Sequence, residues 1–92
     1  MPYIKQDDRK RYDALVDQLV VALLKAGPDE NSTIVGDVNY VISSIIWDLF
    51  DKKKTYTNGN NLTGVLTCVN QEFYRRKLAP YEDLKIKENG DL

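Results

Sequence analysis

Apolar residues recur at steps of three and four along three stretches of this 92-residue chain, and no other feature limits the fold as strongly. Residues three and four apart share one face of an α-helix, whereas successive residues of a strand point to opposite faces. The three apolar stripes are Tyr12, Leu15, Val16, Leu19, Val20, Leu23 and Leu24, then Val38, Val41, Ile42, Ile45, Ile46, Leu49 and Phe50, and finally Leu62, Val65, Leu66, Val69 and Phe73. We therefore predict an all-α protein built on three amphipathic helices.

The first helix is predicted over residues 8–26. Asp7 or Asp8 can cap it, because a carboxylate accepts a hydrogen bond from the free N–H groups at a helix start. Gly27-Pro28 ends it, and a polar loop over residues 27–33 follows.

The second helix begins near residues 34–37. Gly36 is a poor helix former, so we place the true start at Asp37. The helix closes at residues 51–54, where three consecutive lysines suit the negative end of the helix dipole. We interpret these lysines as a solvated helix end, with a nucleic-acid contact as the alternative.

The third helix is predicted over residues 61–78, after a second polar loop over residues 55–61. Pro80 lacks a backbone N–H and disfavours helical angles at Ala79, so we expect the helix to stop and the chain to bend there. Pro80 then opens a short fourth helix, which Asn89-Gly90 ends.

These elements predict one helical domain over residues 1–92, an up-down-up three-helix bundle with a short C-terminal helix. The apolar stripe of the second helix, with Trp47 beside it, is wide for an isolated bundle of this size. We therefore expect a homodimer or a higher homo-oligomer.

Composition excludes several classes of function. Thirteen basic and fourteen acidic residues give a net charge of -1, which argues against a surface built throughout for nucleic acid. With no histidine and a single cysteine, the chain lacks the usual general bases, nucleophile pairs and transition-metal ligands. We therefore predict no enzyme, no metal and no cofactor, and we expect Cys68, beside the third stripe, to be a buried and inert thiol.

The sequence carries no signal that directs the chain out of the cytosol. It shows no secretion segment and no stretch of about 18 apolar residues, the length needed to cross a bilayer. A lone cysteine also fits a reducing compartment. We expect a cytosolic protein without a membrane partner.

Aromatic, cationic and helix-breaking residues are concentrated between residues 74 and 81. Arg75 and Arg76 can hold phosphate oxygens, because guanidinium groups donate paired hydrogen bonds to them. Tyr74 or Tyr81 can stack on a base. Gathered at a bend, these groups predict a site for a nucleotide or another anionic ligand.

The start of the second helix can complete such a site, because Asn39 and Tyr40 can supply hydrogen bonds. A structural interpretation stays open beside it. The arginines can instead pair with nearby acids, namely Glu72, Glu82 or Asp83, while the tyrosines serve as half-buried packing residues.

Five segments carry a resemblance to a known family. They are Met1-Pro2-Tyr3-Ile4, Gly36-Asp37-Val38-Asn39-Tyr40-Val41-Ile42, Glu72-Phe73-Tyr74-Arg75-Arg76, Ala79-Pro80-Tyr81-Glu82-Asp83 and Lys85-Ile86-Lys87-Glu88-Asn89-Gly90-Asp91. Over nearly its whole length the chain resembles a family of small uncharacterised proteins of bacteriophages, prophages and some prokaryotic genomes. The resemblance implies a phage origin and expression in a host cytosol, and it implies no established activity.

Two hypotheses of function follow. In the first, a non-enzymatic phage accessory protein holds a nucleotide or another anionic ligand at the bend and so sequesters a host defence signal. In the second, the chain is a protein-interaction module whose second helix, with Trp47 and Phe50, docks its own copy or blocks a host protein.

Overall fold

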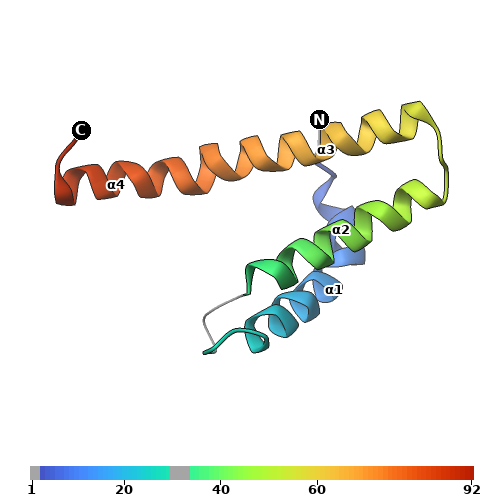
Figure 1. Ribbon diagram of the computed structural model, residues 1–92, viewed down its shortest axis with the longest axis horizontal. Helices are drawn as coiled ribbons and strands as arrows, with labels where there is room; N and C mark the ends of the chain where they lie inside the picture. Colours follow the sequence, from blue (N-terminus) through green and yellow to red (C-terminus); the bar gives the residue numbers. More distant parts are fainter. Residues whose placement is uncertain (1–2, 30–33) are drawn as a thin grey trace. The chain divides into compact units, whose positions relative to one another are not determined.

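The computed structural model describes residues 3–29 and 34–92, and helices make up most of this part of the chain (Figure 1). The elements are α1 (Gln6–Lys25), α2 (Val35–Asp51), α3 (Tyr56–Phe73), the π-helical turn η1 (Tyr74–Leu78) and α4 (Ala79–Asn89). Because these described residues contain no strand, the all-α prediction is confirmed. Of the loop predicted over residues 27–33, positions 30–33 lie outside the described residues.

Contacts divide the chain into two units, residues 1–53 and residues 54–92. The first unit contains α1 and α2, and the second contains α3, η1 and α4. Each unit is described by itself, so the single domain and the up-down-up topology stay predictions.

The start of α1 differs from the expected cap. Lys5 occupies the cap position without a side-chain hydrogen bond, and its backbone oxygen accepts from Asp8 N–H at 3.0 Å. Asp7 and Asp8 lie inside the first turn instead. Neither therefore caps the helix, and both favour it through their charge at the positive end of the dipole.

The start of α2 lies two residues before the predicted Asp37. Ile34 takes the cap position, and its carbonyl accepts from Asp37 N–H at 3.0 Å and Val38 N–H at 3.1 Å. Gly36 is thus inside the first turn. Because helix ends fray, a glycine there lowers the stability of the helix only a little.

The second unit begins with a side-chain cap where a loop was predicted. Thr55 has extended backbone angles, and its Oγ1 accepts a hydrogen bond from Asn58 N–H at 3.1 Å. The loop prediction over residues 55–61 is therefore wrong: residues 56–61, most of them polar, belong to α3. A satisfied cap outweighs their individual turn preferences.

The predicted break at Pro80 is also wrong. Leu78 and Ala79 keep right-handed helical angles, and α3, η1 and α4 follow one another without a loop (Figure 1). Within η1 the Ala79 N–H bonds to the Tyr74 carbonyl, five residues back. We attribute this π turn to Pro80, because a wider turn relieves the clash of its ring with the carbonyl four residues earlier, that of Arg76.

The expected end of α4 is confirmed. Gly90 N–H bonds to the Ile86 carbonyl at 2.8 Å, and Gly90 has a φ of 87°. A residue with a side chain rarely adopts this angle, so glycine suits the position.

No side chain is fully buried in the described residues. The least exposed apolar residues of the first unit are Leu23, Leu24, Val38, Val41 and Ile46, which are half-buried. Cys68 is exposed, contrary to the expectation of a buried thiol, because it lies about 100° around the helix from Val69 on the apolar stripe. Within the same residues no helix combines the length and apolarity needed to cross a membrane.

The Thr55 cap generates a prediction about stability. Thr55→Ala leaves the Asn58 N–H without its acceptor, so we expect the free energy of unfolding to fall by about 1 kcal/mol in urea titrations followed by circular dichroism. Thr57→Ala, in the same helical turn, is the control and should not destabilise the protein. Equal losses in the two variants would contradict the capping role.

Candidate functional site

The six residues predicted to bind a ligand fall into two groups. Asn39 and Tyr40 belong to α2 in the first unit. Tyr74, Arg75 and Arg76 belong to η1, and Tyr81 follows in α4, all in the second unit. The structure thus brings the last four residues onto one continuous helix, and the two groups are described separately.

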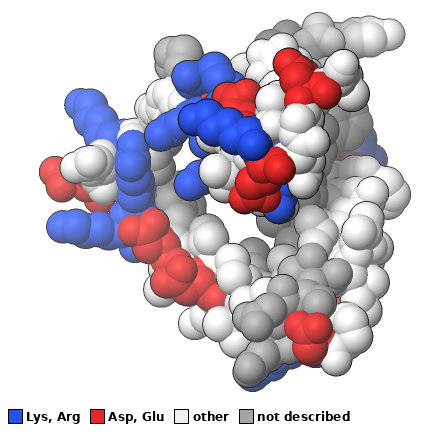
Figure 2. Space-filling model, turned by 90° about the vertical axis from the view of Figure 1, so that its left-hand side faces the viewer, with Lys and Arg blue, Asp and Glu red and all other residues white. Residues whose placement is uncertain are grey.

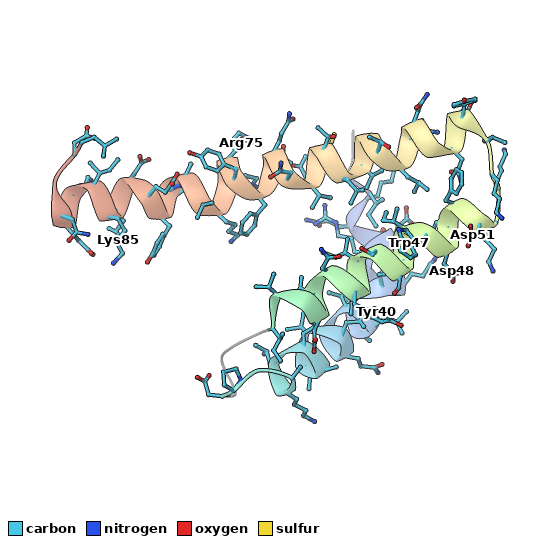
Figure 3. All side chains as sticks on the ribbon, in the orientation of Figure 1. Tyr40, Trp47, Asp48, Asp51, Arg75 and Lys85 are labelled. Carbon is cyan, nitrogen blue, oxygen red and sulfur yellow. The ribbon has the colours of Figure 1, made fainter. Side chains whose placement is uncertain are left out.

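Arg75 is engaged by a carboxylate of its own helix. Its Nη2 lies 3.1 Å from Oε1 and 3.0 Å from Oε2 of Glu72, one turn earlier. This is one of the structural alternatives left open by the sequence. Arg75 remains largely exposed (Figure 3), so the pair contributes at most a few tenths of a kcal/mol to stability, roughly the value of other helical pairs at this spacing.

Arg76 differs from Arg75. It is exposed, and the described residues include no ion pair of its guanidinium group. Lys77 beside it is exposed as well. On the face shown in Figure 2, acidic side chains nevertheless lie among the basic ones, so no uniformly positive surface develops there.

Tyr74 is held by Glu82. Its hydroxyl donates a hydrogen bond of 2.8 Å to Glu82 Oε1 across the π turn. The hydrogen bond to this carboxylate, reinforced by its negative charge and that of Asp83, raises the pKa of Tyr74 above its ordinary value of 10.0. The phenol is therefore a fixed structural donor on the helix surface.

A shallow depression of about 530 Å³ lies beside Tyr74. Its charged lining consists of Glu82, Asp83, Asp91 and Lys85. Three carboxylates against one ammonium group repel a phosphate, so this depression is poorly suited to the predicted ligand. The ring of Tyr81 is also engaged, because Lys85 Nζ lies 5.5 Å from its centroid.

Asn39 and Tyr40 line a second depression, of about 590 Å³, on one face of α2. Asn39 Oδ1 accepts a hydrogen bond of 2.9 Å from Ser43 Oγ. Tyr40 and Trp47 project from the helix (Figure 3), with 73% and 72% of their surface exposed. Sequence reasoning missed this pairing, although the seven-residue spacing of the two aromatic residues places them on one helix face.

Two kinds of side chain alternate on this face. Ser43 and Ser44 are small and lie between Tyr40 and Trp47 along the helix, and Gly36 lies one turn before Tyr40. Large residues around small ones leave notches that accept side chains of a second helix. The face therefore fits a protein surface better than a phosphate, for which it offers no cation. In the described residues no group of three or more potential metal-ligating side chains gathers.

Comparison with known protein families places the whole chain, residues 1–92, within one family model, described as Domain of unknown function (DUF6899). No curated protein matches the chain. No solved structure matches it either.

The Tyr74–Glu82 contact generates a prediction about pH. Because the pKa of Tyr74 is raised in the folded protein, the hydrogen bond contributes its stability fully below about pH 10 and loses it as pH rises through that higher pKa. Glu82→Gln removes the charge, so the pKa of Tyr74 should fall toward 10, measured from tyrosine ring shifts in NMR between about pH 8 and 12.

Glu88→Gln serves as the matched control, because Glu88 pairs with Lys85 and not with Tyr74. It should leave the pKa of Tyr74 unchanged. An unchanged Tyr74 titration in Glu82→Gln would show that the contact does not persist in solution.

Proposed function

The chain belongs to the family of the domain of unknown function DUF6899, and from this premise we propose that it is a non-enzymatic protein-interaction module that associates with its own copies. The observation that supports the proposal most is the exposure of its apolar residues. In the described residues every large hydrophobic side chain keeps at least part of its surface in water, and α2 is the most apolar helix among them. Helices that are apolar over much of their circumference occur buried in larger assemblies.

The apolar surface of α2 has two sides. One is aliphatic and includes Val38, Val41 and Ile46, which are half-buried within the first unit. The other carries Tyr40 and Trp47 and is exposed. Tyrosine and tryptophan dominate the energetics of protein interfaces, because they bury a large area at a small cost in entropy. We propose the aromatic side of α2 as the docking surface.

The partner is a copy of the chain or a host protein. The resemblance to phage and prophage proteins supports a host-cell setting, and we propose that the protein works in the host cytosol. Its nearly balanced charge, -1 in total, supports a protein partner over an extended nucleic acid.

A charge at the centre of the docking surface tests this function. Trp47→Glu should weaken association at least about 30-fold, the equivalent of about 2 kcal/mol for a central aromatic residue, measured by sedimentation equilibrium. Tyr56→Glu is the matched control, because Tyr56 is an equally bulky aromatic residue, 93% exposed, at the start of α3. It should associate like the native protein.

A native protein that stays monomeric at tens of micromolar and retains its helix content would refute self-association. Loss of association in both variants would place the interface elsewhere.

A second candidate function is the binding of a nucleotide or another anion, and Arg76 favours it. Its exposed guanidinium group, beside Lys77, has no ion-pair partner in the described residues. The bend on which the hypothesis depended does not exist, and Arg75 and Tyr74 already have carboxylate partners. The prediction that the six residues bind a ligand therefore stays a prediction.

Calorimetric titration with cyclic and linear nucleotides tests it. If the site exists, at least one nucleotide should give a heat of binding. The affinity for that nucleotide should be about tenfold or more lower in Arg76→Ala, since a charge-assisted hydrogen bond contributes roughly 1.5–3 kcal/mol. Silence across the panel with folded protein would discard this function.

A further inference from the structure

The π turn changes which residues share a face in the second unit. Along α3 the stripe Leu62, Leu66, Val69 and Phe73 advances by steps of four, three and four. The next aliphatic residue on this path, Leu78, comes five positions after Phe73, and Tyr81 and Leu84 follow at steps of three. In an uninterrupted α-helix this step of five would rotate Leu78 about 140° away from Phe73.

One extra residue is absorbed where the backbone bonds five residues back instead of four. Leu78 then takes the place, relative to Phe73, of a residue four positions further on, about 40° away. The same rotation brings Tyr81 from about 80° to about 20° from Phe73, whereas Leu84 moves from about 20° to about 80° and lies at the edge of the stripe. The π turn therefore aligns Leu78 and Tyr81 with the apolar stripe of α3.

The Tyr74–Glu82 hydrogen bond supports this geometry independently. Residues eight apart in an α-helix lie about 80° apart around the axis and about 12 Å apart along it. With one residue absorbed, Tyr74 and Glu82 are spaced like residues seven apart, which lie nearly in line. The two side chains together span the separation along the axis and meet in a hydrogen bond of 2.8 Å. This bond therefore stabilises the π turn that aligns the stripe.

Leu78, Tyr81 and Leu84 extend the stripe of α3 into η1 and α4. All three are exposed, with Tyr81 and Leu84 at 54% and 53%. The distribution of charge around them indicates which surface suits them.

Charge around this segment is divided along the helix. Arg75, Arg76 and Lys77 precede Leu78, whereas Glu82 and Asp83 follow Tyr81. An antiparallel second copy, with its two-fold axis near Ala79-Pro80, places Leu78 of one copy opposite Tyr81 of the other. It also sets the basic segment of each copy opposite the acidic segment of its partner, whereas a parallel pair would oppose like charges.

We propose that the η1–α4 segment is a self-association surface, on which a second copy of the chain packs antiparallel across the stripe of Phe73, Leu78, Tyr81 and Leu84. This inference rests on the proposed function, because it names a copy of the chain as the partner and adds a second surface to α2. Self-recognition by the segment is set by the π turn, which aligns the stripe, and by opposed charges, which select the orientation.

Spin labels on two matched residues test the orientation. Asn70 and Asn89 are exposed and lie at nearly equal distances on either side of the proposed axis. Asn70→Cys and Asn89→Cys, each in a Cys68→Ser background, each carry one spin label. EPR measures the distances between labels in each labelled protein by itself and in a mixture of the two. Circular dichroism and sedimentation equilibrium check that each labelled protein keeps its helix content and its association.

For the antiparallel pair, copies that both carry the label at residue 89, or both at residue 70, should lie about 30 Å apart. The mixed sample should add a short distance of about 10–20 Å. Short distances in the singly labelled samples would show a parallel pair and overturn the proposal. Associated protein without either distance would overturn it too but leave the proposed function standing, whereas monomeric native protein would overturn both.

Discussion

Apolar helix faces need a second surface to exclude water from them, and this need governs the rest of the structure. Burial of apolar area is the main favourable term in folding, and helices in water draw most of their stability from packing. Here the described residues contain helices with clear apolar stripes and no fully buried side chain. The stripes are thus surfaces prepared for contact, and the proposed association through α2 and through η1–α4 follows from that single requirement.

A local constraint decides what the second unit can do. Pro80 cannot donate a backbone hydrogen bond, and the chain absorbs this defect in a π turn without ending the helix. The absence of a bend removes the concave setting in which two arginines and two tyrosines were expected to enclose a ligand. The same turn places Leu78 in line with Phe73, so one proline disfavours a ligand pocket and favours a long contact surface.

Sequence reasoning reached the helices more easily than their ends and their partners. The stripes of α1 and α2 predict both helices, and the observed ends lie within about two residues of expectation. Thr55 shows why an end is missed: composition alone describes the following asparagines and glycine as a loop, but one cap hydrogen bond commits them to α3. The pairing of Arg75 with Glu72 was one of several options, and only helix geometry chooses the residue one turn away. The Tyr74–Glu82 contact could not be foreseen, because eight residues is the wrong spacing for an uninterrupted α-helix.

By itself, the sequence determined the fold class, the approximate extent of α1 and α2, and the lack of the residue types that catalysis and metal binding usually require. Periodicity and residue chemistry are local properties, so they can be read along the chain. The three-dimensional structure alone decided the course of the backbone at Pro80 and the partners of Arg75 and Tyr74. These features depend on how far one helical turn is rotated against the next and on which side chains come into contact. Both are positions in space, which the order of residues along the chain does not give.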